Sequence, residues 1–183
     1  MAIKFPSFLS FVLDNPVRAF FTERKKLINR IGISEGMRVL EVGSGSGFFT
    51  PVLSETVGPK GTIIALDLQK RMIEKLIDKK NKKNLNNVET IVCNISECGL
   101  TPESIDFIFA YYCYHEFEDK PSAVRKFREV LKNKGYIFIC EPRFEVKVKN
   151  KEEMKKLFIQ EGFLFIEEWM TLLSYNLRFQ SNL

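Results

Sequence analysis

The sequence predicts an α/β fold built around one mostly parallel sheet of seven strands, with helices on both faces. Two observations support this prediction. Apolar runs of strand length alternate along the chain with segments whose apolar residues recur at helical spacing. The last two strand-like runs leave no room for a helix between them, so we expect them to form an antiparallel hairpin at the sheet edge.

The expected elements follow one another with short connections. Strands are predicted at 38–42, 62–67, 88–93, 105–110, 135–141, 163–170 and 172–179. Helices are predicted at 47–56, 69–80, 121–131 and 151–161, preceded by one or two N-terminal helices. Ligands of such sheets bind at the carboxyl ends of the strands, so the residues that follow each strand are the first candidates for a site.

Composition indicates a single domain over residues 1–183, with an N-terminal helical cap at 1–33 and a core at 34–183. A chain of 183 residues with 45% hydrophobic content can bury a core without metals or disulfides. The four cysteines lack C-x-x-C spacing and only one histidine is present, so no metal site is expected and the cysteines are assigned to the core. A reducing cytoplasm is the expected location. Neither a transmembrane segment nor a secretory signal is expected.

The net charge of +5 is a mild basic bias. Much of it lies in the lysine- and asparagine-rich stretch 79–87, which is typical of a solvated turn. No aromatic residues are interleaved with these lysines, so the sequence does not favour a nucleic-acid partner.

Three alternating glycines, Gly43, Gly45 and Gly47, interrupt an apolar strand-like run and precede a helix-like pattern. Glycine permits positive φ angles and close approach of a ligand, although a tight turn alone would explain the pattern too. A dinucleotide fingerprint would need a further glycine where this sequence has Phe48. Instead, an acidic residue, Glu41, precedes the first glycine by two positions.

A second carboxylate, Asp67, ends the next predicted strand, 24 positions after Gly43. A short ionised side chain at this place can accept hydrogen bonds from both hydroxyls of a ribose. The alternative is that Asp67 caps the helix expected to begin near Gln69.

Together these two segments resemble the cofactor-binding motifs of class I S-adenosylmethionine (SAM)-dependent methyltransferases, which have a Rossmann-like fold. The resemblance covers about residues 34 to 175 and implies SAM as cofactor. It implies that Glu41 meets the amino end of SAM and that Asp67 binds its ribose. The residues implied to bind the cofactor are Glu41, Gly43, Ser44, Gly45, Gly47, Asp67, Leu68, Met72, Asn94, Ile95 and Tyr111.

The aromatic segment Tyr111–Phe117 matches the family's motif after the fourth strand. The resemblance implies that Tyr111 lines the SAM pocket, and that Tyr114 and His115 face the substrate as candidate catalytic residues. For His115 we prefer a structural hydrogen-bonding role to that of a general base. Asn94 stands where the family more often has an aspartate.

The sequence is therefore interpreted as a methyltransferase that acts on a small-molecule or lipid-like acceptor by in-line displacement. It resembles the group that contains quinone-biosynthesis and arsenite methyltransferases. Two alternatives remain open: an NAD-dependent oxidoreductase on a related fold, and a non-catalytic module that binds SAM or a partner. The Phe-rich N-terminus allows a peripheral membrane contact, although a helix packed on the sheet is preferred. The oligomeric state is not predicted.

Overall fold

The computed structural model describes residues 23–182, so that most of the predicted N-terminal cap lies outside the described residues. Seven strands form a mixed sheet in the order β3-β2-β1-β4-β5-β7-β6. This order, with its antiparallel C-terminal hairpin, confirms the predicted Rossmann-like fold class. The described residues fall into two compact units, 23–94 and 95–182, which are considered separately. The single-domain organisation stays a prediction.

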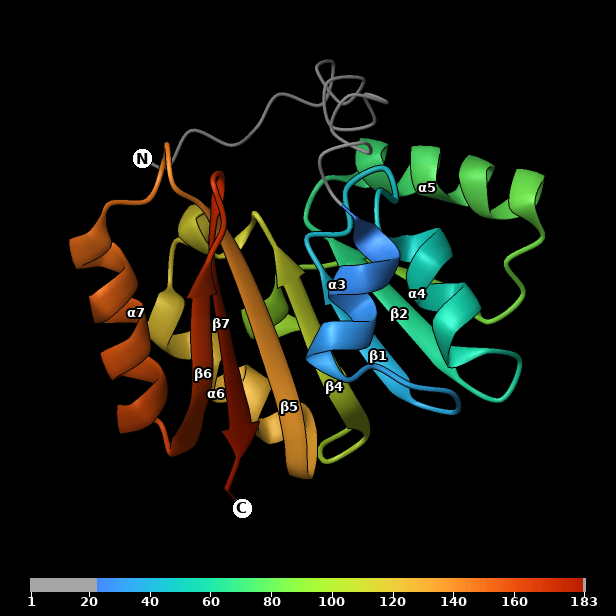
Figure 1. Cartoon of the computed structure of the whole chain (residues 1–183). Helices are drawn as coiled ribbons and strands as arrows, with labels where there is room; N and C mark the ends of the chain where they lie inside the picture. The colour runs from blue at the N-terminus through green and yellow to red at the C-terminus, as the bar shows by residue number, and fades with distance from the viewer. Residues whose placement is uncertain (1–22, 183) are drawn as a thin grey trace. The chain divides into compact units, whose positions relative to one another are not determined.

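The first unit alternates helices and strands. Its elements are α3 (Arg24–Ile31), β1 (Arg38–Val42), α4 (Thr50–Val57), β2 (Thr62–Asp67), α5 (Lys70–Lys83) and β3 (Val88–Val92). β1 pairs with β2 and β2 with β3, both in parallel. Helix α3 packs beside α4 (Figure 1). Parallel pairing brings the carboxyl ends of β1 and β2 to one edge, where the glycine loop and Asp67 lie.

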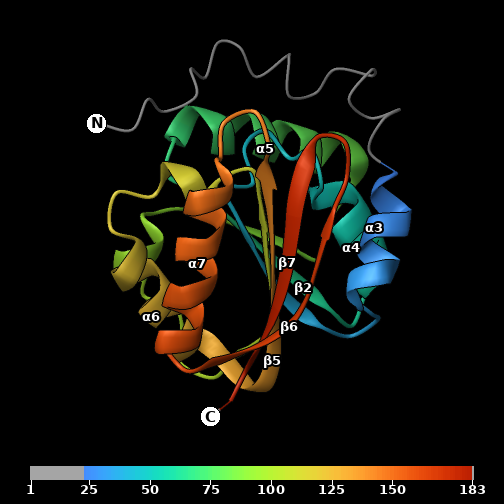
Figure 2. The ribbon, with the colours of Figure 1, turned by 60° about the vertical axis from the view of Figure 1, so that its left-hand side comes forward.

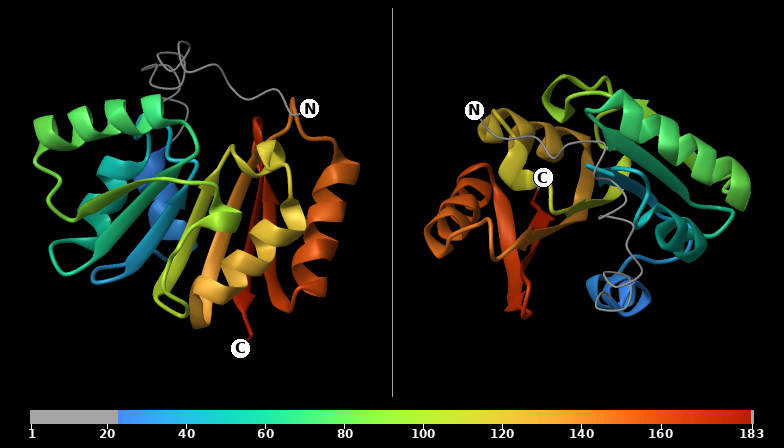
Figure 3. Two further views of the ribbon diagram at one scale, coloured as in Figure 1. Left: turned by 180° about the vertical axis from the view of Figure 1, so that it is seen from behind. Right: turned by 90° about the horizontal axis from the view of Figure 1, so that it is seen from above.

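The second unit contains the antiparallel hairpin. Its elements are η2 (Ile95–Glu97), β4 (Ile105–Tyr111), η3 (Tyr114–Glu116), α6 (Lys120–Val130), β5 (Leu131–Pro142), α7 (Val148–Gln160), β6 (Phe163–Met170) and β7 (Ser174–Ser181). β4 and β5 are parallel, whereas β7 runs antiparallel to both β5 and β6. Helices α6 and α7 cover the same face of these strands (Figures 2 and 3).

Two predicted strand starts were wrong for local reasons, and helix bounds differ by up to three residues, as in α4, which begins at Thr50 rather than at Gly47. β5 begins at Leu131 rather than at Gly135, because Leu131 already pairs with Ile105 of β4. The register then shifts, so that Tyr136 pairs with Phe107, and Lys134 in the stretch between adopts a φ of 60°. The last strand begins at Ser174 rather than at position 172. Thr171 and Ser174 close the hairpin turn before this strand. The backbone N–H of Thr171 donates a hydrogen bond to the carbonyl of Ser174 at 2.9 Å, and their hydroxyls form a hydrogen bond of 2.7 Å.

Aromatic side chains fill the space between the helices and strands of the second unit. Phe158 of α7 is fully buried, and its ring centroid lies 4.6 Å from that of Phe179 on β7 and 5.2 Å from that of Phe163 on β6. The same ring lies 5.8 Å from that of Tyr114. The core packing of α7 therefore reaches a candidate site residue.

We expect Phe158→Ala to lower the free energy of unfolding by about 3–5 kcal/mol, because it leaves a cavity among well-packed rings. Denaturant unfolding followed by circular dichroism measures this loss. The neighbouring Ile159 is 50% exposed, so Ile159→Ala serves as the control and should change stability by about 0.5 kcal/mol or less. Equal losses for the two variants would contradict the assignment of Phe158 to the core.

Candidate active site

The glycine loop follows β1 and adopts the backbone conformation that its sequence predicts. Gly43, Gly45 and Gly47 have φ angles of 66°, 54° and 81°. A Cβ at Gly47 would lie 2.5 Å from the side chain of Leu76 in α5, so this glycine permits close packing of the loop. A Cβ at Gly45 would meet nothing within 4 Å. The surface at Gly45 is therefore open to a ligand.

Asp67 ends β2 and holds the glycine loop. One carboxylate oxygen accepts the backbone N–H of Gly45 at 2.9 Å, and the other accepts that of Gln69 at 2.8 Å. Burial raises the pKa of Asp67, while these two amides oppose the rise. Each oxygen can accept a further hydrogen bond. Asp67 therefore orders the turn before α5 without capping it, because the N-cap position is Gln69, and it retains acceptors for ribose hydroxyls.

Glu41 lies within β1, and its side chain is buried. The hydroxyl of Thr50 donates to it at 2.6 Å. Burial raises the pKa of Glu41 to about 8, against the lowering effects of Thr50 and Lys79, and the negative charge of Asp67 adds to the rise. Glu41 is therefore mostly protonated at neutral pH, and a cationic ligand group beside it would favour the ionised form.

These groups fit the chemistry of SAM. Buried Ser44 has a hydroxyl without a hydrogen-bond partner among residues 23–182, so the loop offers an unused polar group. Glu41 can meet an ammonium, and Asp67 can meet a ribose.

The other residues predicted to bind the cofactor lie near the ends of elements. Leu68 is 48% exposed directly after β2, and Met72 is buried in the first turn of α5. Asn94 is exposed just after β3. In the second unit, Ile95 is buried in η2 and Tyr111 ends β4. Their contact with SAM stays a prediction.

The segment after β4 makes a sharp turn into η3. The ring of Tyr111 stacks on that of Tyr112, with centroids 4.3 Å apart. Tyr112 adopts a φ of 57°, which is rare for a residue other than glycine. Its N–H donates to the carbonyl of Cys140 at 2.7 Å, which ties this turn to β5.

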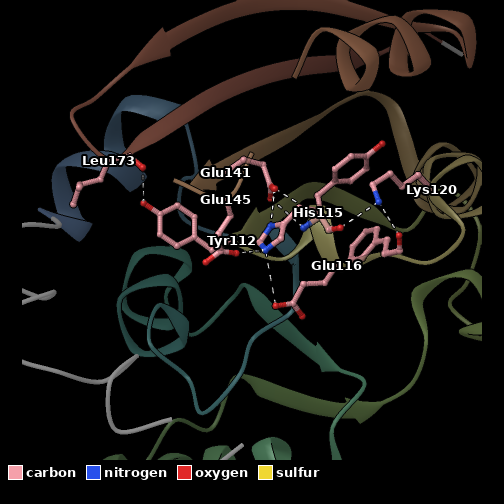
Figure 4. A network of polar contacts seen from close by, with 9 residues as sticks. Tyr112, His115, Glu116, Lys120, Glu141, Glu145 and Leu173 are labelled. Carbon is pink, nitrogen blue, oxygen red and sulfur yellow. Dashed lines mark hydrogen bonds and ion pairs between the residues drawn. The ribbon is translucent and has the colours of Figure 1, made fainter. Parts of the chain in front are cut away.

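Glu141 near the end of β5 is a site residue that the sequence analysis missed. Its side chain is 1% exposed. It accepts the backbone N–H groups of Tyr114 and His115, both at 3.1 Å, and its Oε2 lies 2.7 Å from Nδ1 of His115 (Figure 4). The available signal was an acidic residue at the end of a long apolar strand, directly before Pro142.

His115 has a carboxylate at each ring nitrogen. Its Nε2 lies 2.8 Å from Glu145 and 4.0 Å from Glu116 (Figure 4). Burial lowers the pKa of His115, but the hydrogen bond and charge of Glu141, with the charges of Glu145 and Glu116, outweigh that effect and raise it. A protonated ring that donates from both nitrogens has no lone pair with which to accept a proton. This geometry supports the structural role over that of general base.

Tyr114 lies beside this pair with a buried hydroxyl that lacks a partner among residues 23–182. Burial, followed by the charge of Glu141, raises its pKa. The ammonium of Lys120 lies 5.7 Å from the ring centroid of Tyr114 and donates to the carbonyls of His115 and Phe117. Tyr114 is therefore a neutral hydroxyl held in a fixed position.

Comparison with known proteins identifies the family of this chain. A family model described as a methyltransferase domain matches residues 33–176. The chain belongs to this family. A crystal structure of a SAM-dependent methyltransferase from Aquifex aeolicus matches with a TM-score of 0.89 and 28% identity, over 97% of this chain and 99% of that one. A putative SAM-dependent methyltransferase from Methanococcus maripaludis, at 18% identity and a TM-score of 0.80 over 96% of this chain and 90% of that one, shares the fold.

Curated relatives match over a shorter region. The ubiquinone/menaquinone biosynthesis C-methyltransferase UbiE of Vibrio vulnificus is 32% identical over 111 residues, 60% of this chain and 43% of that protein. The demethylmenaquinone methyltransferase of Staphylococcus aureus is 26% identical over 118 residues, 64% of this chain and 48% of that protein. The matches thus span less than half the length of these relatives.

In this member of the methyltransferase-domain family we expect Glu41→Gln to remove a pH dependence of stability. In the wild type, folding raises the pKa of Glu41, so the folded state holds a proton that the unfolded state has lost. The free energy of unfolding therefore falls as the pH rises from about 4.5 to about 8. Glutamine keeps an acceptor for Thr50 and cannot ionise, so the variant should lack this fall. Unfolding at several pH values measures the slope, and equal slopes in both proteins would refute a proton on Glu41.

His115→Asn should lower the free energy of unfolding by about 3 kcal/mol at pH 6, because it removes the cation that pairs with buried Glu141. The pKa of His115 is raised on folding, so its stabilisation is complete below the ordinary value of 6.5 and is lost as the pH rises through the folded value. The difference between variant and wild type should therefore shrink at alkaline pH. Glu116→Gln, which removes the carboxylate at 4.0 Å from His115 and leaves Glu141 and Glu145 in place, is the control. A pH-independent difference would contradict an imidazolium.

Proposed function

We propose that this protein transfers the methyl group of SAM to a hydrophobic small-molecule acceptor by in-line displacement. The observation that carries the proposal is the pair of carboxylates around the glycine loop, Glu41 and Asp67, in a chain of the methyltransferase family. One carboxylate suits the ammonium of SAM and the other suits its ribose.

The residues of the first unit would hold SAM in complementary ways. Glu41 gains its charge when an ammonium approaches, so it selects a cationic ligand end. Asp67 is pre-oriented by two backbone amides, which lowers the entropic cost of binding ribose hydroxyls. When bound, SAM supplies an electrophilic methyl group on a sulfonium. The protein contributes position and the exclusion of water.

The acceptor is proposed to be the reduced, quinol form of a quinone-like molecule, whose electron-rich ring carbon or hydroxyl oxygen attacks the methyl group and then loses its proton. The names of the curated relatives refer to ubiquinone and menaquinone biosynthesis. The stacked rings of Tyr111 and Tyr112 offer an aromatic surface at the end of β4. Because both nitrogens of His115 lie beside carboxylates, the proposal assigns proton removal to the acceptor's own acidity and to solvent rather than to this histidine.

An NAD-dependent oxidoreductase remains the competing enzyme class. Phe48 stands where a dinucleotide site needs glycine, and its carbonyl accepts Nη1 of Arg24 at 2.6 Å. The guanidinium of Arg24 also lies 4.8 Å from the ring centroid of Phe48. These contacts fill the position with protein atoms, which supports SAM over NAD.

Two measurements test the proposal. Calorimetric titration with SAM and with NAD should show binding of SAM alone, and tight binding of NAD alone would overturn it. Transfer of an isotope-labelled methyl group to the reduced, quinol form of a demethylated quinone analogue, followed by mass spectrometry, should yield a labelled product. SAM binding without product from any of a range of acceptors would instead favour the non-catalytic module.

We expect Asp67→Ala to weaken SAM binding at least tenfold, because charge-assisted hydrogen bonds contribute about 1.5–3 kcal/mol each. Asp119 is a matched control, since its carboxylate accepts the backbone N–H of Ser122 at 2.9 Å and caps α6. Asp119→Ala should cost about 1 kcal/mol of stability without changing SAM affinity. If Asp67→Ala changes only stability, as that control does, Asp67 only orders the turn before α5.

A further inference from the structure

Two loops of the second unit lie together at one end of its strands. The backbone N–H of Arg143, after β5, donates to the carbonyl of Leu173 in the β6–β7 turn at 2.9 Å. The guanidinium of Arg143 donates to the carbonyls of Thr171 and Leu172 in the same turn. The β5–α7 connection and the β6–β7 turn are seen at the same end in Figures 1 and 2.

These loops expose a group of large apolar side chains, here called the apolar rim. Its members and their exposed fractions are Phe144 (73%), Val148 (59%), Met170 (65%), Leu172 (87%) and Leu173 (49%). The four most exposed large apolar side chains among residues 23–182 all belong to it. Single exposed apolar residues are ordinary, but such a concentration on adjacent loops marks a surface that meets something apolar.

Cationic side chains flank the apolar rim. Arg143, Lys147 and Lys149 are exposed within the same short segment. The acidic residue among them, Glu145, is engaged with His115 at 2.8 Å. A second carboxylate, that of Glu153, lies 3.7 Å from Lys149 and offsets part of its charge. The segment from 143 to 149 nevertheless carries more positive than negative charge.

We propose that the apolar rim docks this protein on the surface of an anionic lipid bilayer. Aromatic and aliphatic side chains on protruding loops can enter between lipid headgroups, while neighbouring lysine and arginine side chains meet the negative surface potential. The combination of apolar anchors with a cationic margin complements a lipid surface in both respects. No helix among residues 23–182 is long and apolar enough to cross a membrane.

The apolar rim adjoins the candidate acceptor residues. The hydroxyl of Tyr112 donates to the carbonyl of Leu173 at 3.5 Å, and Glu145 joins the β5–α7 loop to His115 (Figure 4). A bilayer at the rim would deliver a membrane-soluble acceptor directly to the segment after β4. This last step rests on the proposed function, whereas docking itself does not.

Co-sedimentation of the full chain with lipid vesicles tests the docking. The wild type should bind vesicles that contain phosphatidylglycerol, bind pure phosphatidylcholine vesicles more weakly, and lose affinity as salt is added. Phe144→Ser with Leu172→Ser should weaken binding at least tenfold, because two apolar anchors are lost. The control replaces Ile159 and Leu164 by serine, since these side chains have similar chemistry outside the rim and are 50% and 46% exposed.

The charge contribution has its own matched pair. Lys147→Gln with Lys149→Gln should weaken binding to anionic vesicles about fivefold for each cation removed. Lys82→Gln with Lys83→Gln, at the exposed end of α5, changes the net charge equally and should leave binding near the wild-type value.

Three outcomes would overturn the docking proposal: wild-type protein that ignores anionic vesicles, rim variants that bind like the wild type, or rim variants that change only the oligomeric state in gel filtration. The last would make the rim a protein interface. SAM titration of every variant separates this failure from that of the proposed function. A protein that binds vesicles but not SAM refutes only the proposed function. A protein that binds SAM but not vesicles refutes only the docking proposal.

Discussion

The buried carboxylate of Glu141 is the constraint on which the candidate acceptor region depends. A charge removed from water requires hydrogen bonds and a counter-charge, and both come from the two residues at the start of η3. The path of the chain after β4 is therefore fixed by the need to satisfy one side chain of β5. Nε2 of His115 also lies 2.8 Å from the carboxylate of Glu145. The row of alternating charges from Glu141 through His115 therefore continues to Glu145 in the β5–α7 loop, at the surface.

The first unit uses its acidic side chains differently. Asp67 is surrounded by backbone donors, which prepare its oxygens for hydroxyl groups. Glu41 is removed from water, and this effect outweighs those of Thr50 and Lys79, so Glu41 stays mostly protonated until a ligand brings a further cation. Two carboxylates near one loop thus have separate tasks because their surroundings differ.

Much of the fold follows from periodicity, whereas the second half of the site does not. β1, β2 and β6 have the predicted bounds, and Asp67 and the glycines could be found because their roles are set by neighbours in sequence. Glu141 was missed because it acts on residues 26 and 27 positions away, which no local pattern records. The true start of β5 was missed because Lys-Asn-Lys-Gly has the composition of a turn, although Leu131 before it pairs with Ile105 and Tyr136 after it pairs with Phe107.

Tyr112 places an aromatic ring on a backbone conformation that glycine would occupy with less strain, at a cost of about 1 kcal/mol. Replacement of Tyr112 by glycine would keep the hydrogen bond from its backbone N–H to the carbonyl of Cys140. It would remove the ring that stacks on Tyr111. Laboratory evolution for thermostability alone would accordingly favour glycine at this position. Under the proposed function, in which the stacked rings serve the acceptor, selection on turnover would retain tyrosine, and this turn would exchange heat resistance for activity.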